Sequence, residues 1–202
     1  MEKNSIVLAS NNPHKVAEMR EILSSCGVDV IVRDDLPDVI EDRDSFEGNA
    51  EKKAREIAEY TGLICVADDS GLEVDALNGA PGVFSARYAG ADKDYAANNQ
   101  KLLRELTMVS PEKRTARFRT IVALCKPDGS CWFAEGCCEG VILEELRGSN
   151  GFGYDPLFHV SGSTKTMAEM TSEEKHAVSH RGKALRALAE IIKNNTKNIF
   201  QK

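Results

Sequence analysis

Residues 63–72 constrain the fold of this chain more than any other segment. Residues 63–67 form an apolar run rich in β-branched side chains, which predicts a short buried strand. The run leads directly into Asp68 and Asp69, followed by a serine and Gly71. Adjacent carboxylates at the exit of a buried strand repel each other and are partly desolvated, which disfavours their charged forms. The segment therefore indicates either a cation site, for which oxygen ligands suit Mg²⁺ or Mn²⁺, or a turn that Gly71 allows the chain to make.

The size and charge of the chain exclude several classes of protein. Its 202 residues, of which 42% are hydrophobic, are enough for a sizeable core, and we expect one domain over residues 1–202 with room for two lobes. The formal net charge of -6 argues against a broad basic face for nucleic acid. The polar start of the chain is followed by an apolar run that is too short for a signal peptide or a membrane span. We therefore expect a cytoplasmic protein with no nucleic-acid or membrane partner.

The cysteines do not form a recognisable metal or disulfide pattern. There are six, and they are Cys26, Cys65, Cys125, Cys131, Cys137 and Cys138. The Cys-x-x-Cys spacing is absent and no histidine cluster accompanies them, which argues against zinc and against a disulfide scaffold. In a reducing cytosol we expect most of them to be small core residues.

The N-terminal part predicts a strand, a polar turn and a helix. Residues 6–9 are apolar, and the helical pattern begins after Pro13, which suits the first position of a helix. The turn consists of Ser10, Asn11, Asn12, Pro13, His14 and Lys15. Such a turn can bind phosphate, because backbone N–H groups and the helix dipole point at it. It can equally be the capped start of an ordinary helix.

An acidic segment precedes the next predicted helix. Residues 34–44 carry six carboxylates, so the segment is either solvated or brings one carboxylate to a metal ion. A capping box beginning at Asp44 predicts a helix over residues 45–60. Asn49 and Lys53 are four residues apart, so they share one helical face and can point at one site. Surface ion pairing is the alternative for this pair.

The middle of the chain predicts one helix and three strands. These elements cover residues 92–106, 116–124, 131–136 and 141–143.

Two later segments combine unusual residues. In residues 151–158, two glycines stand beside Phe152 and Tyr154, so the backbone can approach a flat ligand on which a ring can stack. The alternative is an aromatic turn that only packs. His180 and Arg181 lie in a break between two helical segments, where they are either ligand contacts or part of a cap.

Taken together, several motifs resemble the inosine triphosphate pyrophosphatase family. They lie in residues 10–15, 45–53, 67–72, 79–88, 151–156 and 174–181, in the order found in that family. The resemblance implies an α/β fold with a long curved mixed sheet flanked by helices, two lobes around a substrate cleft, and a homodimer. It also implies hydrolysis of ITP, dITP and XTP to the monophosphate and pyrophosphate with Mg²⁺, or with Mn²⁺ in its place. Such an activity would clear deaminated purines from the nucleotide pool.

The resemblance also implies roles for individual residues. Asp69 would activate water and bind the metal, Asp68 would assist it, and Lys53 would stabilise the transition state. Glu41 would be the second metal ligand, with Asp42 and Asp44 as close alternatives. The substrate would be bound by Ser10, Asn11, Asn12, Pro13, His14, Lys15, Ser70, Phe152, Gly153, Tyr154, Asp155, Lys175, His180 and Arg181.

Two other functions are compatible with parts of this pattern. One is a pyrophosphatase for pyrimidine or other modified nucleotides on a similar fold, which would keep the carboxylates but not the pairing of Phe152 and Asp155 with His180 and Arg181. The other is a nucleotide-binding module without catalysis. Such a module would not need Asp69, so its function would survive the change Asp69→Asn.

Overall fold

The computed structural model describes residues 4–10, 12–24, 27–90 and 93–201, and the described chain forms two compact units. The first unit is made of Met1–Asp69, Thr120–Gly136 and Arg181–Lys202. The second unit is made of Ser70–Arg119 and Cys137–His180. Two compact units agree with the expectation of two lobes, whereas the single domain and the substrate cleft stay predictions.

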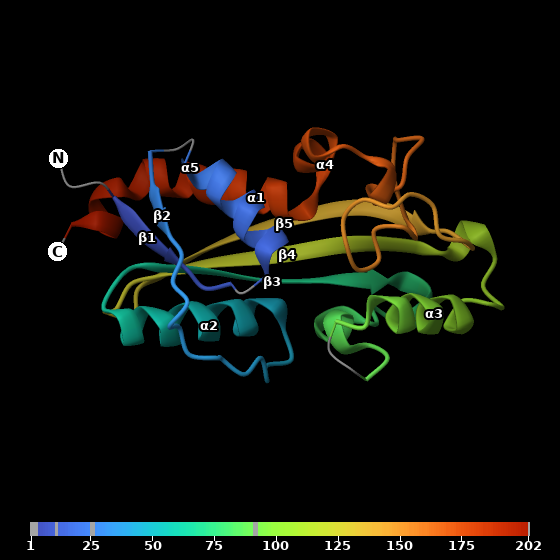
Figure 1. Ribbon diagram of the computed structural model, residues 1–202, viewed down its shortest axis with the longest axis horizontal. Helices are drawn as coiled ribbons and strands as arrows, with labels where there is room; N and C mark the ends of the chain where they lie inside the picture. Colours follow the sequence, from blue (N-terminus) through green and yellow to red (C-terminus); the bar gives the residue numbers. More distant parts are fainter. Residues whose placement is uncertain (1–3, 11, 25–26, 91–92, 202) are drawn as a thin grey trace. The chain divides into compact units, whose positions relative to one another are not determined.

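A six-stranded sheet runs through the protein, with the order β2-β1-β3-β4-β5-β6 (Figure 1). The strands are β1 (Ser5–Leu8), β2 (Asp29–Ile31), β3 (Cys65–Val74), β4 (Thr115–Cys125), β5 (Cys131–Ile142) and β6 (Phe158–Val160). Strand β1 pairs in parallel with both β2 and β3, while β5 and β6 are antiparallel. The sheet is therefore mixed, as the family resemblance implies.

Strand β3 corrects the prediction for its most unusual segment. The strand does not end at Ala67 but continues through Asp68 and Asp69 to Val74, so the alternative of a turn at Gly71 is wrong. Both carboxylates are buried inside the strand. Buried carboxylates normally lose the stabilisation that water gives them. Here charged partners from other elements, described below, stabilise them instead. Since successive side chains of a strand point to opposite faces, the two carboxylates face different surroundings.

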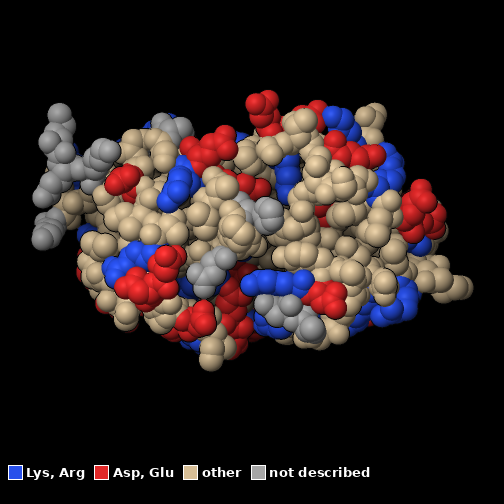
Figure 2. Space-filling view, in the orientation of Figure 1, with Lys and Arg blue, Asp and Glu red and all other residues tan. Residues whose placement is uncertain are grey.

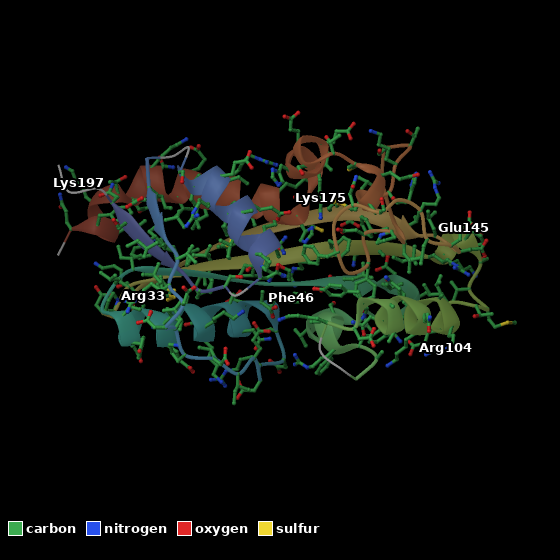
Figure 3. The ribbon with its side chains drawn as sticks, in the orientation of Figure 1. Arg33, Phe46, Arg104, Glu145, Lys175 and Lys197 are labelled. Carbon is green, nitrogen blue, oxygen red and sulfur yellow. A yellow bond between two sulfur atoms is a disulfide. The ribbon has the colours of Figure 1, made fainter. Side chains whose placement is uncertain are left out.

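The first unit packs helices on both faces of its part of the sheet. Helices α1 (Pro13–Ser24) and α5 (His180–Phe200) lie over one face and α2 (Phe46–Thr61) lies over the other (Figure 1). The core on the side of α1 and α5 joins apolar side chains of both helices to those of β1 to β5. Helix α2 buries Phe46 (labelled in Figure 3), Asn49, three alanines and Ile57.

Helix α2 begins one residue later than predicted. Ser45, and not Asp44, is its N-cap, because the Ser45 hydroxyl accepts a hydrogen bond from the Gly48 N–H at 3.1 Å. At the start of α1, Pro13 occupies the first helical position as predicted. These residues define where α1 and α2 begin.

The second unit contains α3 (Tyr95–Glu105), α4 (Ser172–Val178) and four short 3-10 helices. Its core is formed by large apolar side chains from β3 to β6 and from α3. A capping box starts α4, with reciprocal hydrogen bonds between Thr171 and Glu174. The predicted strand at residues 141–143 is not separate, because its first two residues continue β5.

The cysteines differ in one respect from the prediction. Cys125 and Cys131 form a disulfide across the hairpin that joins β4 and β5. The hairpin brings the last residue of one strand opposite the first residue of the next, with their Cα atoms 4.2 Å apart. Cys65 and Cys138 are buried core residues as predicted, and Cys137 is half-buried. Cys26 lies outside the described residues.

Charges of both signs are interspersed on the face of the protein shown in Figure 2. No helix in the described ranges is both long enough and apolar enough to cross a membrane. The expectation that nucleic acid is not a partner stays a prediction.

Candidate functional site

Asp68 lies at the centre of a buried ionic cluster in the first unit. Its Oδ2 atom is 3.0 Å from Nζ of Lys15 on α1 and 3.3 Å from Nε of Arg181 on α5. Arg181 also donates from Nη1 to Glu18 on α1 at 2.7 Å. Burial of Asp68, which is 1% exposed, would raise its pKa, but the charges of Lys15 and Arg181 outweigh burial and hold the pKa below its usual range. Asp68 therefore stays ionised and holds two cations together.

Asp69 faces helix α2 and has the opposite pKa shift. Its Oδ2 atom accepts a hydrogen bond from Nδ2 of Asn49 at 3.0 Å. Burial, followed by the negative charge of Glu41, raises the pKa of Asp69 to about 6. A carboxylate with a pKa near neutrality can take up a proton at physiological pH, which is the property of a general base.

One face of α2 contributes two side chains to this cluster. Asn49 contacts Asp69, and Lys53 forms an ion pair with Glu41 and donates from Nζ to the backbone oxygen of Asp68 at 3.3 Å. Burial would lower the pKa of Lys53, but Glu41 and Asp68 raise it above its usual value, so Lys53 is charged. The prediction that Asn49 and Lys53 point at one site is confirmed.

The acidic segment brings one carboxylate to this cluster. Glu41 lies close enough to Asp69 for its charge to raise the pKa of Asp69. Asp42 instead pairs with Lys52, with 2.8 Å between Oδ1 and Nζ, and the side chain of Asp44 is exposed. Of the three candidates, Glu41 is therefore the one whose contacts lead to Asp69.

The donors at this position fit a hard divalent cation. Glu41 and Asp69 are neighbouring carboxylates, and oxygen ligands of this kind suit Mg²⁺ or Mn²⁺. Lys53 beside Glu41 shows that positive charge is already accommodated there. Among the described residues, no group of three or more His, Cys, Asp or Glu side chains is arranged to hold a metal ion, so the protein would supply two carboxylates and other ligands would come from elsewhere.

The turn of residues 10–15 is held by local hydrogen bonds. The Ser10 hydroxyl accepts from the Asn12 N–H at 3.3 Å, and Oδ1 of Asn12 accepts from the Lys15 N–H at 3.4 Å. Asn12 thus caps α1, which leaves Lys15 in the first turn facing Asp68. Asn11 and the side chain of His14 lie outside the described residues. Binding of phosphate by this turn stays a prediction.

The second unit brings together Phe152, Asp155 and Lys175. Oδ2 of Asp155 accepts from Nζ of Lys175 at 2.8 Å and from the Phe152 N–H at 2.9 Å. The same Nζ atom of Lys175 (Figure 3) lies 5.2 Å from the centre of the Phe152 ring. Gly151 has φ 75°, and a Cβ atom there would lie 2.1 Å from Oδ2 of Asp155, so only glycine fits. The loop thus carries an aromatic ring and a carboxylate, and the cation of Lys175 lies beside both.

The other residues of this loop are fixed by buried side chains. The hydroxyl of Tyr154, which is buried, donates to the backbone oxygen of Ser85 at 2.9 Å. Nδ2 of Asn99 on α3 donates to the backbone oxygen of Gly153 at 2.9 Å. Tyr154 is therefore part of the packing, and Gly153 contributes through its backbone.

His180 and Arg181 are consecutive but have different surroundings. The ring of His180 stacks on Phe118 with 4.8 Å between ring centres, within the second unit. Arg181 belongs to the first unit, where its contacts are with Asp68 and Glu18. The contacts of Arg181 thus place it beside Lys15, and substrate binding by His180 and Arg181 stays a prediction. Ser70 is half-buried and follows Asp69 in β3.

Two residues of these clusters escaped prediction. Glu18 is a carboxylate on a helix with many polar residues, and nothing in its spacing marks it as the partner of Arg181. Asn99 follows a second asparagine, Asn98, and no motif distinguishes the two. Both were detectable only from the fold.

Comparison with known proteins gives one consistent result. The model of the Ham1 family matches residues 6–191 of the chain. A protein named dITP/XTP pyrophosphatase from Desulforamulus reducens is 54% identical over 190 residues, which cover 93% of this chain and 94% of that protein. A protein of the same name from Clostridium perfringens is 48% identical over 204 residues, covering 96% and 98% of the two chains.

Solved structures agree with these matches. A HAM1 protein from Coxiella burnetii superposes with a TM-score of 0.88 at 43% identity, covering 95% of this chain and 99% of that one. The Ham1 protein of Staphylococcus aureus gives a TM-score of 0.86 at 39% identity, with 95% and 100% covered.

Proposed function

The chain belongs to the Ham1 family, and from this premise we propose that it hydrolyses deaminated purine nucleoside triphosphates, namely ITP, dITP and XTP, to the monophosphate and pyrophosphate. The names of its relatives support this activity, because the matches cover nearly the whole of both chains. The observation that carries the chemistry is Asp69, a buried carboxylate with a pKa of about 6 next to Glu41.

In the proposed reaction, Asp69 acts as the general base. It takes a proton from a water molecule whose oxygen forms a bond to the α-phosphorus. The bond from the α-phosphorus to the bridging oxygen breaks, and pyrophosphate leaves with the electron pair of that bond. The hydrogen bond from Asn49 fixes the orientation of the Asp69 carboxylate.

Three cations of the first unit would stabilise the negative charge of the triphosphate. Lys15, Lys53 and Arg181 all contact Asp68, the first and last through its carboxylate and Lys53 through its backbone oxygen. Asp68 keeps these cations in place, so that they need not reorganise when charge develops on the leaving group. The turn of residues 10–15 would bind phosphate oxygens through its backbone.

Glu41 and Asp69 would hold the metal ion, Mg²⁺ or Mn²⁺. When bound, the metal would lower the pKa of water and neutralise phosphate charge. The support for this site is the proximity of the two carboxylates, because the charge of Glu41 disfavours the ionised form of Asp69 and a bound cation would favour it.

The second unit would recognise the base. Phe152 offers a ring on which a purine can stack, and Nζ of Lys175 is a donor for the 6-keto oxygen of hypoxanthine or xanthine. Adenine presents a 6-amino donor there, so the donor of Lys175 would lose its partner at a cost of about 1–3 kcal/mol. Asp155 holds Lys175, and His180 would line the same region.

Two broader properties belong to this proposal. We expect the protein to be cytoplasmic, where nucleotide pools are found, and to form a homodimer. Light scattering of the purified protein measures the second property, and a monomer at micromolar concentration would contradict it.

The experiment for the function is a product analysis. The purified protein is incubated with Mg²⁺ and, separately, with ITP, XTP, GTP, ATP and the pyrimidine triphosphates. We expect monophosphate and pyrophosphate from ITP and XTP, and little product from ATP and GTP. Orthophosphate would place the attack at the γ-phosphorus and refute the mechanism.

Other outcomes would favour other functions. Turnover of pyrimidine nucleotides alone would indicate a pyrophosphatase of different specificity. Binding without turnover, unchanged in Asp69→Asn, would indicate a nucleotide-binding module.

A further inference from the structure

Lys52 contacts both neighbours of Glu41. It lies on α2 immediately before Lys53, and its Nζ atom donates to the backbone oxygen of Ile40 at 2.8 Å and to Oδ1 of Asp42 at 2.8 Å. We define residues 40–43 as the acidic loop. One ammonium group thus holds the chain on either side of Glu41.

Asn49 provides a further attachment of the acidic loop. Its Oδ1 atom accepts from the Arg43 N–H at 2.9 Å, while its Nδ2 atom donates to Asp69 at 3.0 Å. Asn49 is therefore shared between the loop and the catalytic carboxylate. Residues 41–43 adopt neither helix nor strand, so the position of Glu41 depends on these side-chain contacts from α2.

We propose that Lys52 is a positioning residue for the metal site, which holds the acidic loop so that Glu41 faces Asp69. This inference rests on the proposed function, in which Glu41 and Asp69 bind the cation. Lys52 itself is directed at the backbone and at Asp42, and the ion pair of Glu41 is with Lys53. Lys52 therefore acts through the loop and not as a ligand.

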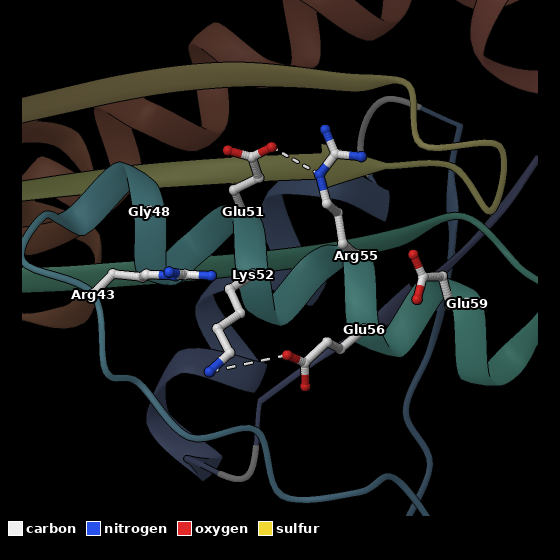
Figure 4. Close-up of a pocket in the computed structure, with 7 residues that line it drawn as sticks. All are labelled: Arg43, Gly48, Glu51, Lys52, Arg55, Glu56 and Glu59. Carbon is white, nitrogen blue, oxygen red and sulfur yellow. Dashed lines mark hydrogen bonds and ion pairs between the residues drawn. The ribbon is translucent and has the colours of Figure 1, made fainter.

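The contacts of Lys52 distinguish it from an ordinary surface ion pair. The side chain of Lys52 is 18% exposed whereas that of Asp42 is 55% exposed, so the ammonium group is the more buried partner. An exposed ion pair contributes little, but the bond to the Ile40 oxygen fixes the backbone itself. Lys52 is also 4.0 Å from Glu56, one turn further along α2 (Figure 4).

The direction in which metal affinity changes when Lys52 is replaced distinguishes a positioning role from a purely electrostatic one. Removing a positive charge near a cation site should by itself strengthen metal binding. Releasing a loop that carries a ligand should weaken it, and groups that orient metal ligands are typically worth about tenfold or more in affinity. Lys52→Met removes both the charge and the contacts, so the direction of the change shows which effect dominates.

The test measures binding of Mn²⁺ to the full chain without nucleotide, by electron paramagnetic resonance of the free ion. We expect Lys52→Met to weaken binding about tenfold. In activity assays, the Mg²⁺ concentration for half-maximal rate should rise by a similar factor, with kcat at saturating Mg²⁺ nearly unchanged. Lys52→Arg keeps a charged donor and should restore much of the affinity.

Arg55→Met is the matched control. Arg55 lies on the same helix, but its contacts are Glu51 and the backbone oxygen of Gly129, and none of its hydrogen bonds or ion pairs reaches the acidic loop within the described residues (Figure 4). Losing this cation should leave Mn²⁺ affinity unchanged or slightly stronger. A thermal unfolding curve for each variant confirms folding, and Lys52→Gln replaces Lys52→Met should the latter unfold.

The outcomes separate this inference from the function on which it rests. If the wild type does not bind Mn²⁺, or if Glu41→Gln binds it equally well, the metal site itself is wrong. If Glu41→Gln weakens binding but Lys52→Met leaves it unchanged or strengthens it, positioning by Lys52 is overturned while the metal site stands.

Discussion

Replacing Asp69 by Asn should abolish turnover and at the same time stabilise the metal-free protein at neutral pH. Asp69 is 6% exposed, and burial together with Glu41 raises its pKa from 3.8 to about 6. At pH 7 the folded protein must therefore hold an unfavourable negative charge that the unfolded chain carries without cost. Asparagine has the same shape and no charge, and its oxygen can still accept the hydrogen bond from Asn49.

The size and sign of the effect follow from proton linkage. Between pH 3.8 and about 6 the folded state binds more protons at Asp69 than the unfolded state, so stability falls as the pH rises through this window. Each pKa unit corresponds to about 1.4 kcal/mol, so the loss above pH 6 is at most about 3 kcal/mol. For a chain of this size that corresponds to a difference in Tm of roughly 6–12 °C.

The assay is thermal unfolding in EDTA at several pH values from 4 to 8. Asp69→Asn should have the higher Tm at pH 7 to 8, and the difference should shrink toward pH 4. Adding Mg²⁺ should raise the Tm of the wild type more than that of the variant, because ligands stabilise the state that binds them. Glu59→Gln, which removes an exposed carboxylate of α2, is the control and should change little.

Two results would refute this reasoning. A folded Asp69→Asn protein that still turns over ITP would show that Asp69 is not the general base. A stability difference that is absent at pH 8, or equal at pH 4 and pH 8, would show that Asp69 is not an energetically unfavourable charge in the folded state.

Three further substitutions test other contacts. Lys175→Met should lower kcat/KM for ITP at least tenfold and kcat/KM for ATP much less, because it removes the donor held by Asp155. Equal losses of kcat/KM for both nucleotides would contradict base recognition. Asn99→Ala should change the free energy of unfolding, measured by urea titration, by less than about 1 kcal/mol. The variant loses the hydrogen bond to Gly153, but it also removes Oδ1, a buried acceptor with no hydrogen-bond partner among the described residues. Ser45→Ala should cost about 1 kcal/mol in the same titrations through loss of the α2 cap, and an unchanged urea midpoint would contradict that role.

Most helices and strands of this fold could be predicted from residue patterns. Helix α2 follows from apolar side chains that recur with the helical period, because one face must be buried against the sheet. Its first residue was misplaced by one, since Asp44 and Ser45 are both good caps and only the backbone conformation decides between them. Such errors at the ends of elements do not move the side chains that matter.

The prediction failed where tertiary partners override local polarity. The sequence of β3 after Ala67 is polar and resembles the end of a strand, but the strand continues because Lys15 and Arg181 neutralise Asp68 inside the fold. Arg181 lies 113 residues from Asp68 in the chain, so no local pattern could indicate their contact. The same holds for Lys52, whose role depends on how the acidic loop returns to α2.

The site could be predicted where side chains share one element, and not where the fold brings them together. Asn49 and Lys53 were paired correctly because residues four apart lie on one helical face. His180 and Arg181 were both expected among the substrate-binding residues, but their side chains have different surroundings, with His180 beside Phe118 and Arg181 beside Asp68. Consecutive residues need not share surroundings, whereas residues three or four apart on a helix lie on one face.

Strand geometry explains how two neighbouring aspartates acquire opposite properties. Because successive side chains of a strand alternate, Asp68 turns to the cations on α1 and α5 whereas Asp69 turns to Asn49 on α2. The pKa of Asp69 is raised by burial and by Glu41, while that of Asp68 is lowered by its cations. One carboxylate is thus permanently charged and organises the cations, and its neighbour can accept a proton near neutral pH. Pairs of acidic groups whose pKa values are driven apart by their environments are a recurrent way to separate electrostatic and acid–base roles in one site.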